Sequence, residues 1–366
     1  MIRLSSLSPV ALAAAVAAVA PGPVGAQVPE SAGARAVGTV HGVVQVGPVD
    51  PVPYAVVAMP PRFPQRFTDG AGAFVFTRVP AGTYHLQVRQ VGYRPVDTSI
   101  VVVPGLTTAV TVVIERLTVQ LEAITVVTAR DACTEPGPPD AGSPELSALF
   151  EQLEQYARQY RLLVASYQFR YRMIRTFADL DEVGNLAWME RDTVSYQSSA
   201  TAHYRPGDVI VTSDQPDGTR RRDVILPNIA DLADDGFQTS HCFTYAGRVG
   251  QGLVRFHFRP PESQTAPDLE GDVDLDPRTY QIRRASVSLT HADQAQEGMR
   301  AAASNITFAE LLPNIVVQKQ VVSFQELAAP VLQLGGAKRI SRYVEDQRLV
   351  DVHFLHPLPG AQEPAP

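Results

Sequence analysis

Residues Thr68–Tyr93 read TDGAGAFVFTRVPAGTYHLQVRQVGY. Two short runs within this stretch, Ala73–Phe76 and Tyr84–Arg89, are rich in the β-branched and aromatic residues that favour strands. Asp69-Gly70 precedes the first run, and Pro80-Ala81-Gly82 separates the two runs. Because these are turn residues, the stretch predicts two β-strands joined by a tight reversal.

The same pattern continues on both sides of this stretch. Further β-type runs occupy Val43–Val46, Tyr54–Ala58, Ile100–Val103 and Ala109–Ile114, again separated by turn signals. Several short strands at close spacing favour a sandwich over a parallel α/β sheet. We therefore expect residues 37–127 to form a β-sandwich.

Residues 38–115 resemble the carboxypeptidase regulatory-like domain, whose pattern is T-D-x-x-G-x-F, then P-x-G-x-Y, then G-Y. The residues that carry the resemblance are Thr68, Asp69, Gly72, Phe74, Phe76, Val79, Pro80, Gly82, Tyr84, Leu86, Val88, Gly92 and Tyr93. The resemblance implies a seven-stranded, transthyretin-like sandwich of the carbohydrate-binding-like class. Domains of this family accompany exported enzymes and outer-membrane proteins as accessory modules without catalytic residues.

A Pro- and Gly-rich segment follows the sandwich, and residues 128–143 are predicted to be a linker. A helix is expected to begin at Pro144 with Ser143 as its N-cap. Its predicted apolar face consists of Leu146, Leu149, Phe150, Leu153, Ala157 and Tyr160. One helix with one apolar face requires a partner, most simply a sheet.

After this helix the apolar period changes to two, as in the alternation of Tyr167, Phe169 and Tyr171 with polar residues. Ten further strands are predicted before residue 356. We expect residues 144–356 to form a larger antiparallel β domain with an N-terminal helix, and 357–366 to be a loose tail. The predicted fold class is mainly β.

The second domain is similar to the open half-barrels of lipoprotein-carrier envelope proteins. The similarity lies in Phe243–Gly247, Leu253–Phe258 and Gly271–Tyr280, which resemble strand pairs ending in a D-x-x-T turn. It implies a sheet that curls around a helix and can offer an apolar groove for acyl chains.

Residues 1–26 have the pattern of a secretory signal peptide. Arg3 precedes the apolar run Val10–Ala20, and Val24-Gly25-Ala26 supplies small residues before a cleavage point. The run is too short to span a bilayer comfortably, and no later stretch is a candidate membrane helix. The sequence therefore predicts export, to the periplasm or outer envelope of a bacterium.

The chain has two cysteines, Cys133 and Cys242. In an exported chain such a pair favours a disulfide, although two separate thiols remain an alternative. The formal net charge of −7 argues against a nucleic-acid partner, because phosphate binding needs clustered Lys and Arg.

Motifs of common enzyme classes are missing from the sequence: it has no G-x-S-x-G elbow, P-loop, H-E-x-x-H or paired C-x-x-C. Asp272, Asp274 and Asp276 imitate the start of a calcium loop. Pro277 stands where its sharp turn needs Gly, and Arg283 where a bidentate Glu is required. We therefore interpret these acids as the solvent face of a strand that runs into a turn.

Histidines give no clear metal set either. His353 and His356 would point to opposite faces of a strand. His241 and the adjacent Cys242 could form a pair of metal ligands, but no further thiol is left to join them. Surface or packing roles are the default for these histidines, and we expect no catalytic, metal or cofactor site.

Two groups of residues are candidates for partner contact. Arg220, Arg221 and Arg222 follow Asp217-Gly218 at a predicted hairpin tip, where they form either a contact to anionic headgroups or glycans or a solvated turn. Tyr167, Phe169, Tyr171 and Trp188 line either an apolar pocket or ordinary sheet core.

These observations predict a non-catalytic exported envelope protein with an accessory binding or scaffolding role. Its second domain would hold a lipid, glycan or protein partner. One alternative is an enzyme, a hydrolase with an unrecognised site in 165–355. Another is a structural component of an outer-membrane assembly. Convergent acids and histidines at one pocket would favour the enzyme, and an apolar groove would favour the binding protein.

Overall fold

The computed structural model describes residues 36–119, 133–138, 144–181, 183–199, 204–214, 220–224, 231, 234–330 and 338–360. The predicted signal peptide lies outside these residues, as do 361–366 of the predicted tail and all of the predicted linker except 133–138. The described chain is mainly β, which confirms the predicted fold class. No helix in the described residues has the length and apolar character needed to cross a membrane.

The first domain is a sandwich of two four-stranded sheets. One sheet contains β1 (Val37–Val46), β2 (Asp50–Pro51), β5 (Ala73–Pro80) and β8 (Thr107–Val113). The other contains β3 (Val56–Met59), β4 (Phe63–Phe67), β6 (Gly82–Arg89) and β7 (Val96–Val102). Neighbouring strands are antiparallel except β1 and β8, which are parallel. The resemblance implied seven strands, and the eighth is the two-residue β2.

The turn before β5 explains the motif that begins at Thr68. Asp69 Oδ1 accepts hydrogen bonds from the backbone N–H groups of Ala71 (2.9 Å) and Ala73 (2.8 Å). Gly72 has φ +72°, and a Cβ there would lie 2.5 Å from Val44 O. Only glycine fits such a close approach in the left-handed region. The buried hydroxyl of Thr68 holds the loop before β3, donating to Val52 O and accepting from Ala55 N.

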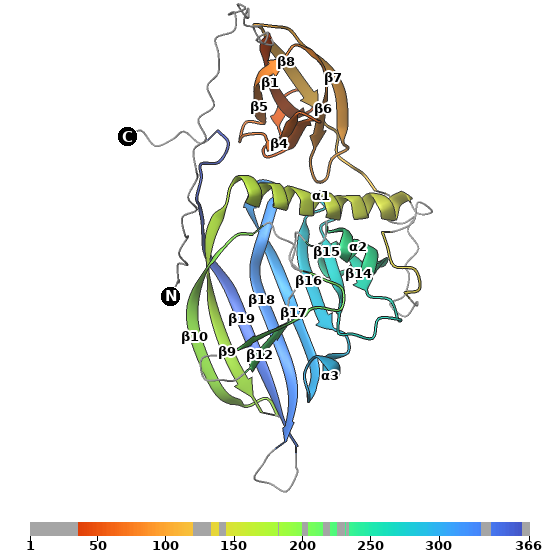
Figure 1. Ribbon diagram of the computed structural model, residues 1–366, viewed down its shortest axis with the longest axis vertical. Coiled ribbons are helices and arrows are strands. Elements are labelled where there is room, and N and C mark those ends of the chain that lie inside the picture. Colours follow the sequence, from red (N-terminus) through yellow and green to blue (C-terminus); the bar gives the residue numbers. More distant parts are fainter. Residues whose placement is uncertain are drawn as a thin grey trace, which may run out of the picture. The chain divides into compact units, whose positions relative to one another are not determined.

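The second domain begins with α1 (Pro144–Ser166), which lies across one end of a large sheet (Figure 1). The predicted apolar face of α1 is confirmed: Leu149, Phe150, Leu153 and Ala157 are buried.

The sheet has nine antiparallel strands. In spatial order these are β10 (Leu186–Gln197), β9 (Phe169–Leu180), β19 (Lys338–Phe354), β18 (Ile315–Pro330), β17 (Met299–Leu312), β16 (Ile282–Leu289), β15 (Leu269–Leu275), β14 (Leu253–Arg259) and β13 (Cys242–Val249). The first strand after α1 therefore pairs with the last strand of the chain. The sheet is open, with β10 and β13 as its edges.

Smaller elements complete this domain. They are the hairpin β11 (Ile210–Asp214) and β12 (Arg220–Val224), the helices α2 (Asp235–Ser240) and α3 (Ala292–Ala295), and the 3₁₀ turn η3 (Gly250–Gly252).

One register row crosses all nine strands. From β10 to β13 it contains Glu190, Phe177, Glu345, Ser323, Ser304, Val287, Gly271, Phe258 and Phe243. Residues directly opposite one another in antiparallel strands point to the same side. We call this side the inner face. At the β13 end it packs against the helices: Phe150 of α1 and Phe237 of α2 contact Phe243, with ring centroids 4.8 and 6.0 Å apart.

A disulfide joins Cys133 to Cys242, with the Cα atoms 5.7 Å apart. This confirms the predicted bond. Gly137 forms a bridge beside Cys242, and its N–H donates to His241 O at 2.8 Å. The segment 133–138 therefore covers the start of β13, where an edge strand would otherwise present unpaired backbone groups.

Candidate ligand-binding site

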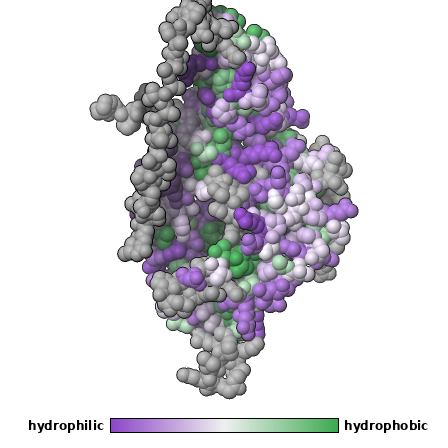
Figure 2. Space-filling view, in the orientation of Figure 1, coloured by the Kyte–Doolittle hydropathy of each residue, from purple (hydrophilic) through white to green (hydrophobic). Residues whose placement is uncertain are grey.

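An open cavity of about 510 Å³ lies on β9, β10, β18 and β19. Most of the side chains that line it belong to the inner face, including Phe177, Trp188, Glu190, Gln325, Tyr343 and Glu345. In the space-filling view the second domain is hollowed, and hydrophilic and hydrophobic surfaces meet within the hollow (Figure 2). The lining is thus mixed, and differs from the apolar groove that the half-barrel similarity implied.

Two neighbouring rows of the sheet build the cavity wall. The first row contains Trp188, Tyr343 and Gln325 together with Asp179, which pairs with Trp188 and Tyr343 but does not line the cavity. The second row consists of Glu190, Phe177, Glu345 and Ser323. Trp188 and Tyr343 are 50% and 43% exposed, which is high for large aromatic residues on a strand. Their apolar surface is therefore available to a ligand.

Asp179 lies between Trp188 and Tyr343 in the first of these two rows. Its Oδ1 atom is buried and has no hydrogen-bond partner in the described part of the chain. A buried carboxylate oxygen without a partner is costly, so Asp179 lowers the stability of this part of the sheet.

A third row of the same face, Asp192, Arg175 and Gln347, lies next to the row that contains Phe177. The Nε atom of Arg175 donates to Asp192 Oδ1 at 3.0 Å, and the guanidinium lies 5.1 Å from the centre of the Phe177 ring. The hydrogen bond from Arg175 holds the pKa of Asp192 below its usual value, against a small opposing effect of burial. Beside this pair, Gln347 Nε2 donates to Glu345 Oε1 at 2.9 Å. Arg175 thus forms a two-point ion pair with Asp192, and its charge also interacts with Glu345.

A smaller cavity of about 140 Å³ continues from this wall towards β15, β16 and β17. It shares Ser323, Gln325 and Glu345 with the larger cavity. The hydroxyls of Ser304 and Ser323 lie 2.7 Å apart across its floor. Polar side chains therefore line the inner face from Glu190 on β10 to Ser304 on β17.

The strand that carries the predicted arginine cluster reaches this region at Val224. Arg220, Arg221 and Arg222 are in β12, paired with Asp214, Ser213 and Thr212 of β11. Val224, at the end of β12, lines the smaller cavity. The side chains of the three arginines lie outside the described structure, so their contact with a partner stays a prediction.

The predicted aromatic group is divided between two places. Trp188 lines the large cavity. Phe169 and Tyr171 line a separate cavity of about 240 Å³ beneath α1, where Phe169 packs against Phe354 and Tyr171 stacks on Tyr196. Tyr167 precedes β9 and lines neither cavity.

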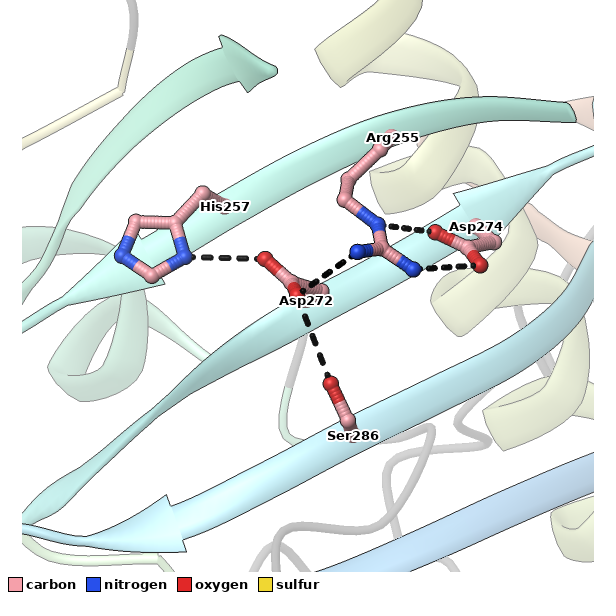
Figure 3. Close-up of polar contacts among 5 residues, drawn as sticks. All are labelled: Arg255, His257, Asp272, Asp274 and Ser286. Carbon is pink, nitrogen blue, oxygen red and sulfur yellow. Dashed lines mark hydrogen bonds and ion pairs between the residues drawn. The ribbon is translucent and has the colours of Figure 1, made fainter. Parts of the chain in front are cut away.

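On the outer face of the sheet, charged residues of β14 and β15 form an ion-pair ladder (Figure 3). Arg255 Nε lies 2.7 Å from Asp274 Oδ1, and its Nη1 lies 3.2 Å from Asp272 Oδ2. His257 Nδ1 lies 2.9 Å from Asp272 Oδ1. Among the described residues no group of acids, histidines or cysteines could hold a metal ion. The interpretation of these acids as a solvent face is wrong for Asp274, whose side chain is 4% exposed.

This ladder lacks the geometry of a nucleophilic triad. Ser286 Oγ lies 3.5 Å from Asp272 Oδ2, so the hydroxyl and His257 both contact the same carboxylate (Figure 3). A triad instead needs the histidine between the hydroxyl and the acid. We interpret the ladder as a structural element of the outer face.

His241 is a fully buried packing residue, as the default interpretation expected. Its Nδ1 lies 2.9 Å from Phe237 O and its Nε2 lies 3.0 Å from Leu269 O. Nearby, the Tyr204 hydroxyl donates to Asp268 Oδ1 at 2.7 Å. Burial lowers the pKa of His241, although the two carbonyls and the charge of Asp268 oppose the shift.

Sequence reasoning missed most of the large cavity. Phe177, Gln325, Tyr343 and Glu345 carry no motif, and they meet only because β9 and β19 pair across the whole domain. The sequence analysis assigned none of these four residues to a face of the sheet or to a neighbouring strand.

None of the curated proteins matches this chain. Among solved structures, a protein described as "a putative carbohydrate binding protein" from Bacteroides uniformis ATCC 8492 is 8% identical. The alignment covers 87% of this chain and 99% of that one, with a TM-score of 0.19, and we infer neither fold nor ligand from so low a score. The model of the carboxypeptidase regulatory-like domain matches residues 39–115. The sandwich of this chain is therefore a carboxypeptidase regulatory-like domain.

Proposed function

We propose that the protein is an exported, non-catalytic binding protein whose second domain holds a glycan in the large inner-face cavity. The sandwich is then an accessory module. The single observation that carries the proposal is the composition of the cavity wall: two exposed aromatic side chains, Trp188 and Tyr343, stand beside amide, hydroxyl and carboxylate groups.

This combination suits a sugar ring. The C–H face of a pyranose packs against an aromatic side chain, which offers a large apolar area with little loss of conformational freedom. Gln325 and Ser323 can donate and accept hydrogen bonds with hydroxyl groups, and Glu190 and Glu345 can accept them. A cavity of about 510 Å³ lies in the usual size range of small-molecule sites.

An acyl chain suits the same wall less well. It would cover Glu190, Gln325 and Glu345 without supplying a hydrogen bond, and burying such groups without a partner costs free energy. Of the three predicted partner classes, the glycan therefore has the best chemical match.

Two further observations support export. The N-terminal residues have the pattern of a secretory signal, and the Cys133–Cys242 bond is typical of proteins that fold in an oxidising compartment.

The chain has one tryptophan, Trp188, so its intrinsic fluorescence reports directly on the cavity. Titration with soluble oligosaccharides should change this fluorescence saturably, and a long-chain fatty acid should not. By calorimetry, Trp188→Ala and Tyr343→Ala should each weaken binding at least about tenfold, because each removes a stacking face. Met189→Ala is the matched control, since Met189 is exposed to a similar degree (59%, against 50% for Trp188) but lies on the outer face.

The proposal fails if no saccharide binds, or if a fatty acid binds and competes for the site. A loss of affinity in Met189→Ala equal to that in Trp188→Ala would also contradict it.

One observation favours a second candidate, a glycoside hydrolase. Glu190 and Glu345 lie in one row with Phe177 between them. Two strand spacings separate their backbones by roughly 10 Å. Inverting glycosidases place their two carboxyl groups roughly 6.5–9.5 Å apart. If the site hydrolyses its ligand, new reducing ends should appear, and Glu190→Gln or Glu345→Gln should abolish their release. An oligosaccharide that stays intact with equimolar protein would exclude this candidate.

A further inference from the structure

We propose that the cavity of about 240 Å³ beneath α1 is a second binding site, which takes an uncharged, mainly apolar molecule the size of one substituted aromatic ring. We call it the α1 cavity. It shares no lining residue with the proposed glycan site. The proposal therefore does not rest on the glycan-binding function.

Apolar side chains form most of the wall of the α1 cavity. They include Phe169 and Met173 on β9, Val317 on β18, and Leu349 and Val352 on β19. Tyrosine, glutamine and serine side chains make up the rest, so no lining residue carries a formal charge. An ionised ligand would lose water here without gaining a counter-charge, which is costly. The site therefore selects uncharged molecules.

Two tyrosines bring hydroxyl groups to this apolar wall. Tyr160 of α1 and Tyr171 of β9 both line the cavity, and neither hydroxyl makes a hydrogen bond within the described residues. Burial raises the pKa of Tyr160, and the neighbouring Tyr171 adds to the shift. Tyr160 therefore keeps its proton at neutral pH and can donate it to a carbonyl oxygen of a ligand.

The volume of the cavity sets the size of the ligand. In another protein, an engineered apolar cavity of about 150 Å³ holds one benzene molecule. By proportion, the α1 cavity has room for roughly ten non-hydrogen atoms, enough for a benzene ring with a short substituent. By the same proportion, a fatty acid of roughly sixteen carbon atoms would extend well beyond it.

The aromatic walls favour an aromatic ligand. Phe169 packs edge-on against Phe354, and Tyr171 stacks on Tyr196, with ring centroids 5.5 and 5.4 Å apart. These contacts hold both lining rings in place before a ligand binds, which lowers the cost of ordering them. A ligand ring can extend the same edge-on and stacked arrangements.

The test compares acetophenone with α-methylstyrene, in which a methylene group replaces the carbonyl oxygen. In calorimetric titrations of the full chain, acetophenone should bind at least about fivefold more tightly, because only its carbonyl can accept a hydrogen bond from Tyr160. Nuclear Overhauser effects should connect bound acetophenone with the methyl groups of Val317 and Leu349, which line the α1 cavity.

Substitutions assign the binding to residues. Tyr160→Phe keeps the ring and removes the hydroxyl, so it should weaken acetophenone binding about fivefold and leave α-methylstyrene binding unchanged. Leu349→Trp should fill part of the cavity and weaken the binding of both compounds. Tyr84→Phe is the matched control, because it makes the same chemical change on β6 of the sandwich. Circular dichroism and the melting temperature check that each variant is folded.

Three outcomes would overturn the proposal. One is that neither compound binds, and another is that acetophenone binds Tyr160→Phe and Leu349→Trp as tightly as the wild type. The third is that palmitate displaces acetophenone, which would identify an acyl site instead. None of these outcomes depends on whether a saccharide binds, so the second site and the glycan-binding function can fail independently.

Discussion

The hydroxyl of Tyr156 on α1 donates a hydrogen bond to Val316 O at 2.6 Å and accepts one from Val316 N at 2.9 Å. β18 begins at Ile315, but its pairing with β19 begins only at Gln320. Tyr156 therefore satisfies backbone groups on a part of β18 that pairs with no strand on that side among the described residues. The contact holds α1 against the start of β18 at the end of the sheet.

Replacing Tyr156 by phenylalanine should destabilise the protein by about 1–3 kcal/mol, because both backbone groups of the buried Val316 lose their partner. Urea unfolding followed by circular dichroism measures the change. Tyr160→Phe is the control from the same helix, since the Tyr160 hydroxyl makes no hydrogen bond within the described residues. Equal losses in the two variants would show that the Val316 contact contributes nothing.

The ion-pair ladder of β14 and β15 should stabilise the fold only above acidic pH, where Asp272 is ionised. Burial opposes ionisation of Asp272, but the hydrogen bond from His257 and the charge of Arg255 outweigh it and lower the pKa of Asp272. A carboxyl with a lowered pKa in the folded state stabilises the fold above its ordinary pKa of about 4, and the contribution disappears as the pH falls through the folded value. Asp272→Asn should cost about 1 kcal/mol at pH 7 and much less at pH 3. A cost that is the same at both pH values would contradict this role.

His241 should produce a separate pH dependence near neutrality. Its pKa is lowered by burial, so the unfolded chain takes up a proton near pH 6.5 that the folded chain does not. Stability should therefore be complete above about pH 7 and decrease as the pH falls below 6.5. NMR titration of the wild-type imidazole should find that His241 takes up its proton below the ordinary histidine pKa of about 6.5. Protonation of His241 above pH 6.5 would exclude this mechanism.

Gly271 should tolerate no side chain. It lies in the register row that crosses the sheet, and a Cβ at this position would stand 2.0 Å from Ser286 O. Gly271→Ala should destabilise the fold by about 1–3 kcal/mol, since β15 and β16 would have to separate. Gly250→Ala should be close to neutral, because a Cβ there meets nothing within 4 Å. Thermal unfolding of the two variants decides the matter, and equal melting temperatures would refute the packing argument.

Local signals predicted the strands well. The alternation at Leu253–Phe258 gave β14, and the apolar positions Leu149 and Leu153 gave the buried side of α1. These features depend on side chains within one element, so periodicity alone is enough to find them.

The pairing of strands that lie far apart in the chain could not be predicted from the sequence. Tyr343 and Asp179 are 164 positions apart and become neighbours only through the pairing of β9 with β19. Neither residue carries a motif, so nothing in one sequence indicates that they lie side by side. In contrast, the pairing of Cys133 with Cys242 could be predicted, because only one partner existed for each thiol.

That bond also closes a covalent ring that contains α1 and the strands β9 to β12. A protease that cuts the chain once anywhere between the two cysteines would leave a single molecule of unchanged mass, apart from one added water. The cut would become visible only after reduction, when the two fragments migrate apart. After a single cut in this segment, the disulfide would thus keep both halves of the protein in one covalent molecule.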